Sequence, residues 1–217
     1  AGDTYRIKVK GRQTHGAMPW AGIDPIVVAS QIVIGLQTVV SRQIDLTTAP
    51  AVVTVGTIEG GSRHNIVPDE VRMSGTIRTF DPDMRKEILA RVKRTAENIA
   101  EAAGATAELI LDEGYPVTWN DPALTERMTP SLKRVAAGTF NPNAQPTTTS
   151  EDFSYYGQKV PALYFFLGVA PKGSDPAAWA AALRDLAGDP ERGAGLARAG
   201  IAHAERFTWE AAARQVL

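Results

Sequence analysis

The sequence predicts an α+β protein whose first part, about residues 3–115, is a ferredoxin-like β-α-β-β-α-β domain. Two observations support this fold class. Segments with strand patterning and two long helical segments follow one another in that order, and glycine and proline separate them at short intervals. In this fold a four-stranded antiparallel sheet carries both helices on one face. The other face can stand in water, and the edge strand or a helix is available for pairing with a second copy of the chain.

The first strand and the first helix are predicted by periodicity and by capping. Apolar and polar residues alternate over residues 5–9, and the pattern stops at Gly11, as it does in a half-buried strand. Asp24 is a suitable N-cap and Pro25 suits the first helical position. We therefore expect a helix from Pro25 to about Arg42.

Three more strands and a second helix complete the predicted domain. β-Branched residues predict a strand at 50–61, and alternation predicts another at 70–80. An Asp-Pro pair opens a helix at 81–103, and Gly104 ends it. Residues 106–115 supply the fourth strand, which stops before a proline.

The chain changes character after residue 115. A capped helix is predicted within 120–138, and residues 141–161 are rich in turn formers. Residues 162–168, "ALYFFLG", form a continuous apolar run that is typical of a strand buried on both faces, and such a strand would belong to a different, larger sheet. From 171 to 217 the chain is alanine-rich, which predicts helices.

Composition excludes several classes of function. The 23 basic and 24 acidic residues nearly cancel and form no run of like charge, so neither nucleic acid nor an anionic membrane surface is an expected partner. There is no cysteine, so any metal must be held by His, Asp or Glu. The apolar stretch 26–40 is interrupted by polar residues and is too short to span a bilayer. The N-terminus shows no basic region followed by an apolar one, and we expect a cytoplasmic protein.

Three residues of the first domain are candidates for a site, and each also has a simpler interpretation. His15 stands in a glycine-containing turn, where a lone histidine is more often structural or solvent-facing than catalytic. Asn65 is equally well explained as a turn residue, and Arg78 as a solvated arginine on a strand. The residue types alone leave both interpretations open.

A fourth candidate lies in the turn-rich segment. Glu151 and Asp152 suggest a metal site, because hard divalent ions accept paired carboxylates. Ser150 and Asp152 could instead cap a short helix.

Short motifs occur in a definite order along the chain, with strand and helix patterns between them. They are "GRQTHGAMP" with "GIDP" (11–25), "HNIVPDE" (64–70), "GTIRTFD" (75–81) and "TSEDFSYY" (149–156). On these motifs the sequence resembles the co-catalytic metal amidohydrolases of the aminoacylase, hippurate hydrolase and indole-acetyl-amino-acid hydrolase type, within the larger carboxypeptidase and aminoacylase metallopeptidase group. The resemblance covers about residues 2–168.

The resemblance implies an architecture and a substrate class. In this family a catalytic domain binds two metals, usually zinc or manganese, and an inserted β-α-β-β-α-β lid domain closes over it and commonly mediates dimerisation. Residues 1–115 would then be the lid and dimerisation domain, 116–170 the C-terminal part of the catalytic domain, and 171–217 a helical tail of separate origin. A homodimer and a small N-acyl amino acid substrate are implied.

The resemblance also implies roles for single residues. His15 matches a lid histidine that reaches an active site, in several members that of the partner subunit, and stabilises the tetrahedral oxyanion by donating a hydrogen bond. Asn65 and Arg78 match lid residues that hold the substrate's carboxylate or polarise the scissile carbonyl, and the planar arginine fork fits a carboxylate. His64 precedes Asn65 in a loop where family members vary, and we expect it to be structural. Glu151 is a site-proximal residue of the catalytic domain, because the family's metal-binding carboxylates lie elsewhere.

The sequence also departs from the family. The family's metal ligands are a histidine- or cysteine-bearing segment, a Glu-Glu pair and further histidines, most of them upstream of the lid, and this sequence does not contain that half. The last family ligand is a histidine shortly after the "FFLG" segment, where this chain has "GVAPKGSDPAAW". With three histidines in all, two of them in the lid, we expect no metal on this chain alone. We therefore expect a fragment, a truncated product or a fusion.

The tail carries a second resemblance. From about Ala181 it is similar to the C-terminal helices of GT-B glycosyltransferases, and His203 within it is expected to be an exposed or cap-adjacent helix residue. The sequence thus leaves three hypotheses: a metal-dependent amidohydrolase of N-acyl amino acids, a catalytically inactive dimerisation module, and a sugar-nucleotide enzyme. The third lacks a nucleotide-binding domain and a glycine-rich phosphate loop.

Overall fold

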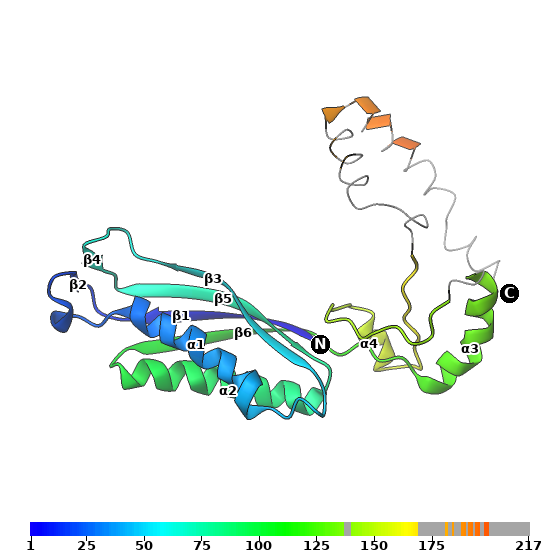
Figure 1. Cartoon of the computed structure of the whole chain (residues 1–217), viewed down its shortest axis with the longest axis horizontal. Helices are drawn as coiled ribbons and strands as arrows, with labels where there is room; N and C mark the ends of the chain where they lie inside the picture. Colours follow the sequence, from blue (N-terminus) through cyan, green and yellow to red (C-terminus); the bar gives the residue numbers. More distant parts are fainter. Residues whose placement is uncertain are drawn as a thin grey trace. The chain divides into compact units, whose positions relative to one another are not determined.

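The computed structural model describes residues 1–136 and 140–168, together with ten separate positions between 181 and 199. The chain divides into two compact units, Ala1–Phe165 and Phe166–Leu217. The elements of the first unit, in chain order, are β1 (Gly2–Lys10), β2 (Thr14–His15), the 3₁₀ helix η1 (Pro19–Ala21), α1 (Pro25–Gln43), β3 (Ala51–Gly60), β4 (Ile66–Val67), β5 (Glu70–Thr79), α2 (Pro82–Ala102), β6 (Thr106–Tyr115), α3 (Pro122–Val135) and α4 (Ser154–Gly157) (Figure 1).

The main sheet has four strands in the order β3-β5-β1-β6, and neighbouring strands pair antiparallel. Helices α1 and α2 lie beside each other along one face of this sheet (Figure 1). The predicted α+β class and the β-α-β-β-α-β order are therefore confirmed. The small β2–β4 ladder is an addition that the sequence patterns did not predict.

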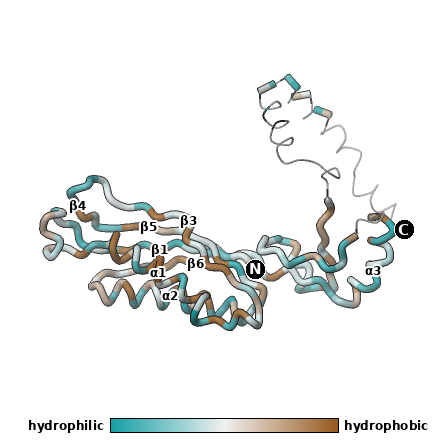
Figure 2. The backbone as a smooth tube through the Cα atoms, in the orientation of Figure 1, coloured by the Kyte–Doolittle hydropathy of each residue, from teal (hydrophilic) through white to brown (hydrophobic). Residues whose placement is uncertain are grey.

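The core lies between the sheet and the two helices. Alternation along β1 buries Tyr5, Ile7 and Val9, and hydrophobic and hydrophilic residues alternate in the same way elsewhere in the sheet (Figure 2). The helices contribute side chains at helical spacing: Val28, Ala29, Ile32, Leu36 and Val39 from α1, and Met84, Ile88, Val92, Ala96 and Ala100 from α2.

Both long helices begin where the capping signals predicted. The Asp24 carboxylate accepts hydrogen bonds from the backbone N–H groups of Ile26 and Val27, at 2.9 and 3.3 Å. The Asp81 carboxylate does the same at the start of α2. Each cap is followed by a proline, which needs no hydrogen bond at the first helical position.

Helix α1 is longer than the apolar stretch that predicted it. At 19 residues it is long and apolar enough to cross a membrane by length and composition alone, so the estimate that the stretch was too short was wrong for the helix as formed. A core helix passes the same test, and the buried face of α1 packs against the sheet.

The prediction of a buried strand at 162–168 is wrong. These residues belong to no strand, and the side chains of Phe166 and Leu167 are 63% and 77% exposed. Hydrogen bonds to the 120–121 segment hold the start of the run instead: the Asn120 side chain donates to Tyr164 O at 2.9 Å and accepts from Tyr164 N at 2.7 Å. No strand among residues 1–136 and 140–168 lies against this run, so no sheet buries it.

The proposed side-chain caps at 150 and 152 are also absent. Helix α4 begins after Phe153 without a side-chain cap, and Ser154 hydrogen-bonds the Glu151 carbonyl with both its backbone N–H and its hydroxyl. Most of the tail, including His203 and residues 169–180, lies outside the described residues. The domain boundaries at 115 and 170 stay predictions.

Candidate functional site

The β2–β4 ladder brings His15 and Asn65 together. His15 pairs with Ile66 in this ladder, and the backbone N–H of the next residue, Gly16, donates to Asn65 O at 2.8 Å. Two residues that are fifty positions apart in the sequence thus lie close together at the end of the main sheet: His15 is in the small ladder, and Asn65 comes directly before β4. The exposed His15 and Asn65 side chains can both reach a ligand there.

The turn that carries His15 is held by a closed backbone ring. Arg12 and Ile23 exchange two hydrogen bonds, of 2.9 and 3.0 Å, which join the two ends of the turn. Gly22 makes this closure possible, because a Cβ there would lie 2.4 Å from Arg12 O. The turn is therefore a fixed support rather than a free loop.

Hydrogen bonding orients the His15 imidazole and selects its tautomer. The backbone N–H of Ala17 donates to Nδ1 at 3.1 Å. An Nδ1 that accepts a hydrogen bond carries no proton, so the neutral ring carries its proton on Nε2. Because His15 is exposed, this Nε2–H is a hydrogen-bond donor that a ligand can reach.

Arg78 lies on β5, opposite Gly2 of β1 and Val52 of β3. Its Nη1 donates to the carbonyls of Asp3 and Ile77 at 3.4 and 3.2 Å. No carboxylate of the described residues forms an ion pair with it. Its charge is therefore available to a ligand.

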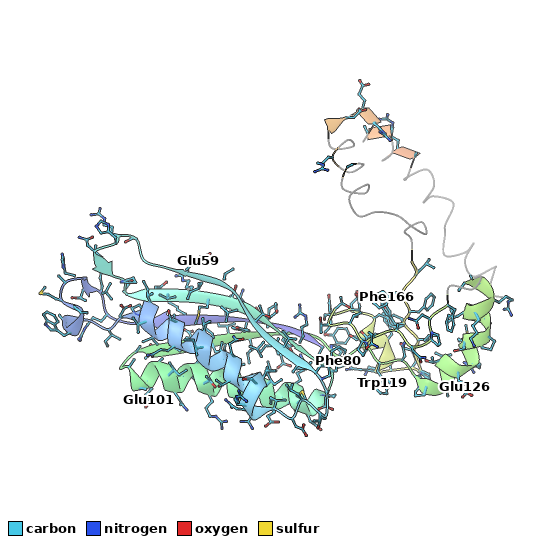
Figure 3. All side chains as sticks on the ribbon, viewed as in Figure 1. Glu59, Phe80, Glu101, Trp119, Glu126 and Phe166 are labelled. Atoms are coloured by element: carbon cyan, nitrogen blue, oxygen red, sulfur yellow. The ribbon has the colours of Figure 1, made fainter. Side chains whose placement is uncertain are left out.

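One chain does not bring His15 and Arg78 together. The His15 turn adjoins the Glu70 end of β5, since Gly11 hydrogen-bonds Asp69 there, and Arg78 lies near the other end. At about 3.3 Å per residue the two ends of this strand are on the order of 25 Å apart. Phe80, one residue past the end of β5, marks the Arg78 end of the sheet in Figure 3.

Glu151 lies in the turn before α4 and not on the sheet. Burial and, after it, the nearby Glu151 carboxylate raise the pKa of the Tyr164 hydroxyl. Within the described part of the chain no group of three His, Asp or Glu side chains is placed to hold a metal ion. Nothing in this geometry assigns Glu151 as a ligand.

Sequence reasoning missed a buried ion pair. Asp3 is 1% exposed, and its carboxylate accepts two hydrogen bonds from Arg85, at 2.5 and 2.9 Å, and one from Gly114 N at 3.0 Å. Side chains alternate between the two faces of β1, so Asp3 lies on the same buried face as Tyr5. This alternation could have predicted from the sequence that Asp3 is buried.

Comparison with known proteins agrees with this architecture. Residues 3–104 match the family model M20_dimer, a peptidase dimerisation domain. The chain is 36% identical to an N-acetyl-L-cysteine deacetylase of Bacillus subtilis (strain 168), over 76% of this chain and 39% of that protein. It is 38% identical to an N-acetyldiaminopimelate deacetylase of Leuconostoc citreum (strain KM20), over 76% and 42%. The chain thus spans about two fifths of the length of these relatives.

A solved structure gives the same result. The Bacillus subtilis YxeP protein, described as a dinuclear metal binding peptidase from the M20 family, superposes with a TM-score of 0.58 at 30% identity, over 74% of this chain and 38% of that one. The resemblance inferred from the motifs is confirmed. Residues 3–104 of this chain are therefore a peptidase dimerisation domain of the M20 family.

Proposed function

We propose that this protein contributes the lid and dimerisation region of an amidohydrolase that cleaves the amide bond of N-acyl amino acids. The two deacetylases named above support the substrate class. The observation that carries the proposal is the hydrogen bond from Ala17 N to His15 Nδ1, because it leaves the exposed Nε2–H free to donate.

In this proposal His15 acts on the oxyanion. Negative charge grows on the carbonyl oxygen as the amide is attacked, and a donor that is already oriented stabilises that charge without reorganising. Asn65, directly before β4, would donate to the same carbonyl, and its position next to the His15 turn supports this role. Arg78 holds the substrate's carboxylate.

The separation within one chain favours a homodimer. A small substrate cannot contact both His15 and Arg78 across a strand length on the order of 25 Å. A second copy can supply His15 to the site that contains the first copy's Arg78. The match of residues 3–104 to a dimerisation domain supports this arrangement.

The M20 neighbour described above is a dinuclear metal binding peptidase, so the family implies a two-metal centre, for which we propose zinc or manganese and which would activate water when bound. The described residues of this chain do not fit that centre, because they bring no three metal-binding side chains together. We assign no metal ligand to them and derive no step through a metal.

A second candidate function is a catalytically inactive dimerisation module. The lack of converging metal ligands among the described residues favours it. The two candidates predict different stoichiometries, since an active enzyme needs bound metal and a module needs only a partner.

Elemental analysis of the purified protein, with hydrolysis of a panel of N-acyl amino acids, separates the two. The amidohydrolase requires bound metal and turnover, and we expect His15→Ala to lower kcat by about 10²- to 10³-fold, as the loss of an oxyanion donor does. His64→Ala is the matched control and should keep its activity. A dimer without metal or turnover would establish the module instead.

A further inference from the structure

The Thr14 side chain contacts the turn that carries His15 at two later points. Its backbone pairs with Val67 in the β2–β4 ladder, and its hydroxyl donates to Met18 O at 3.2 Å. Its Cγ2 packs against Gly22, where an added Cβ would lie 2.6 Å from that methyl carbon. One half-buried threonine therefore ties the turn to the ladder.

Met18 connects Thr14 to the imidazole. The backbone N–H of Met18 donates to His15 O at 2.8 Å and closes a four-residue turn. Within that turn the Ala17 N–H donates to His15 Nδ1 at 3.1 Å. Met18 follows Ala17 directly, so the Thr14 hydroxyl restrains the backbone that directs the Ala17 N–H at the ring.

The hydrogen bond from Thr14 to Met18 is not needed to satisfy a buried group. The Met18 carbonyl also accepts from Ala21 N at 3.0 Å, so it keeps a partner when the hydroxyl is removed. The bond lies at the exposed surface, where water can replace it and its contribution to global stability is small. Its main effect is therefore on the local geometry of the turn.

We propose that Thr14 is a positioning residue for His15: its hydroxyl fixes the turn that keeps Nδ1 as an acceptor and Nε2–H as the oriented donor. The inference rests on the proposed function for the role of His15, and Thr14 is the new element. A donor oriented in advance stabilises a developing oxyanion without reorganising. Loss of the hydroxyl should therefore lower kcat and leave KM nearly unchanged.

Ring ¹⁵N NMR of the full chain tests the positioning without turnover. At about pH 9, with the imidazole neutral, wild-type His15 should show mainly the Nε2–H tautomer. Thr14→Val keeps the shape and removes the hydroxyl, so it should show more Nδ1–H tautomer, and exchange of the Ala17 amide should rise about fivefold, as expected for one net hydrogen bond. Thr14→Ser keeps the hydroxyl and should restore both signals. Thr38→Val removes an exposed hydroxyl that donates to Gly35 O in α1 and should change neither.

A thermal melt and the Gly16 amide distinguish positioning from a structural role. We expect the melting temperature and Gly16 exchange to stay unchanged in Thr14→Val. A lower melting temperature with faster Gly16 exchange would show that Thr14 only stabilises the ladder, and would overturn the inference. An unchanged His15 ring pattern in Thr14→Val, or a Thr14→Ser variant that does not restore it, would also overturn it. A wild type without turnover but with the expected ring signals would overturn the proposed function and leave the positioning of the ring established.

Discussion

At the scale of single residues, the Asp3–Arg85 pair stabilises the junction of β1, α2 and β6. The two hydrogen bonds from Arg85 and the one from Gly114 N satisfy a carboxylate that has almost no contact with water. A buried charge is tolerated only with such partners. Removing one member of the pair therefore destabilises the fold strongly, because the other charge stays buried without a partner.

We expect Asp3→Ala to lower the free energy of unfolding by about 3 kcal/mol, because it leaves the partly buried Arg85 without its main partner. Asp112→Ala is the control, since the Arg6–Asp112 pair is exposed on both sides and should cost less than about 1 kcal/mol. Urea denaturation of both variants measures the difference. Equal losses would contradict a specific role for the buried pair.

A second residue-scale prediction concerns Tyr5. Burial raises the pKa of its hydroxyl to about 12, and that hydroxyl donates to Thr54 O at 2.9 Å. The folded pKa lies above the unfolded value of 10.0, so the stabilisation is complete below pH 10 and is lost as the pH rises toward 12. Urea titrations between pH 9 and 12 measure the free energy of unfolding. In Tyr5→Phe this free energy should no longer fall over that pH range. The exposed Tyr115→Phe should retain it.

At the scale of elements, the turn between β2 and α1 depends on one close approach. Gly22→Ala would place a methyl group against Arg12 O and force the turn open, at a cost of about 1–3 kcal/mol. Faster amide hydrogen exchange at Gly16, whose N–H donates to Asn65 O, and at the ladder residue Ile66 would show that the turn has opened. Gly56→Ala is the control, because the nearest atom to its Cβ would be 3.8 Å away. Unchanged exchange in Gly22→Ala would show that the turn tolerates the shift.

At the scale of the whole molecule, the two edges of the sheet differ in apolar exposure. Large hydrophobic side chains are exposed on α1 and on the edge strand β3: Ile26, Val27, Ile34, Val52 and Ile58. Helix α2, which packs nearer the other edge strand β6, exposes none, and β6 itself exposes only two, Ile110 and Tyr115. Exposed apolar residues grouped on one side indicate an association surface. The α1–β3 side is therefore where we expect the second copy to bind.

The proposed homodimer can be tested on that side. Ile34 is 69% exposed, so Ile34→Glu should leave the core intact and convert dimers to monomers in size-exclusion chromatography with light scattering. Ile110→Glu changes an exposed isoleucine on β6 and should remain dimeric. If both variants behave alike, the α1–β3 side does not carry the interface.

The elements followed from local signals, whereas the site did not. Alternation in β1 and the Asp-Pro caps at 24–25 and 81–82 predicted the strand and both helices, because periodicity and capping act between residues close in sequence. The prediction of a strand at 162–168 was wrong, because an apolar segment becomes a strand only when another strand pairs with it.

The β-α-β-β-α-β order, the candidate residues and the family resemblance could all be inferred from the amino-acid sequence. The fold then brought some candidates together and kept others apart: the β2–β4 ladder holds His15 next to Asn65, whereas Arg78 lies near the far end of β5. The reason is physical, because strand pairing and side-chain burial join residues that are distant along the chain. The local sequence patterns that predict strands and helices do not predict such contacts.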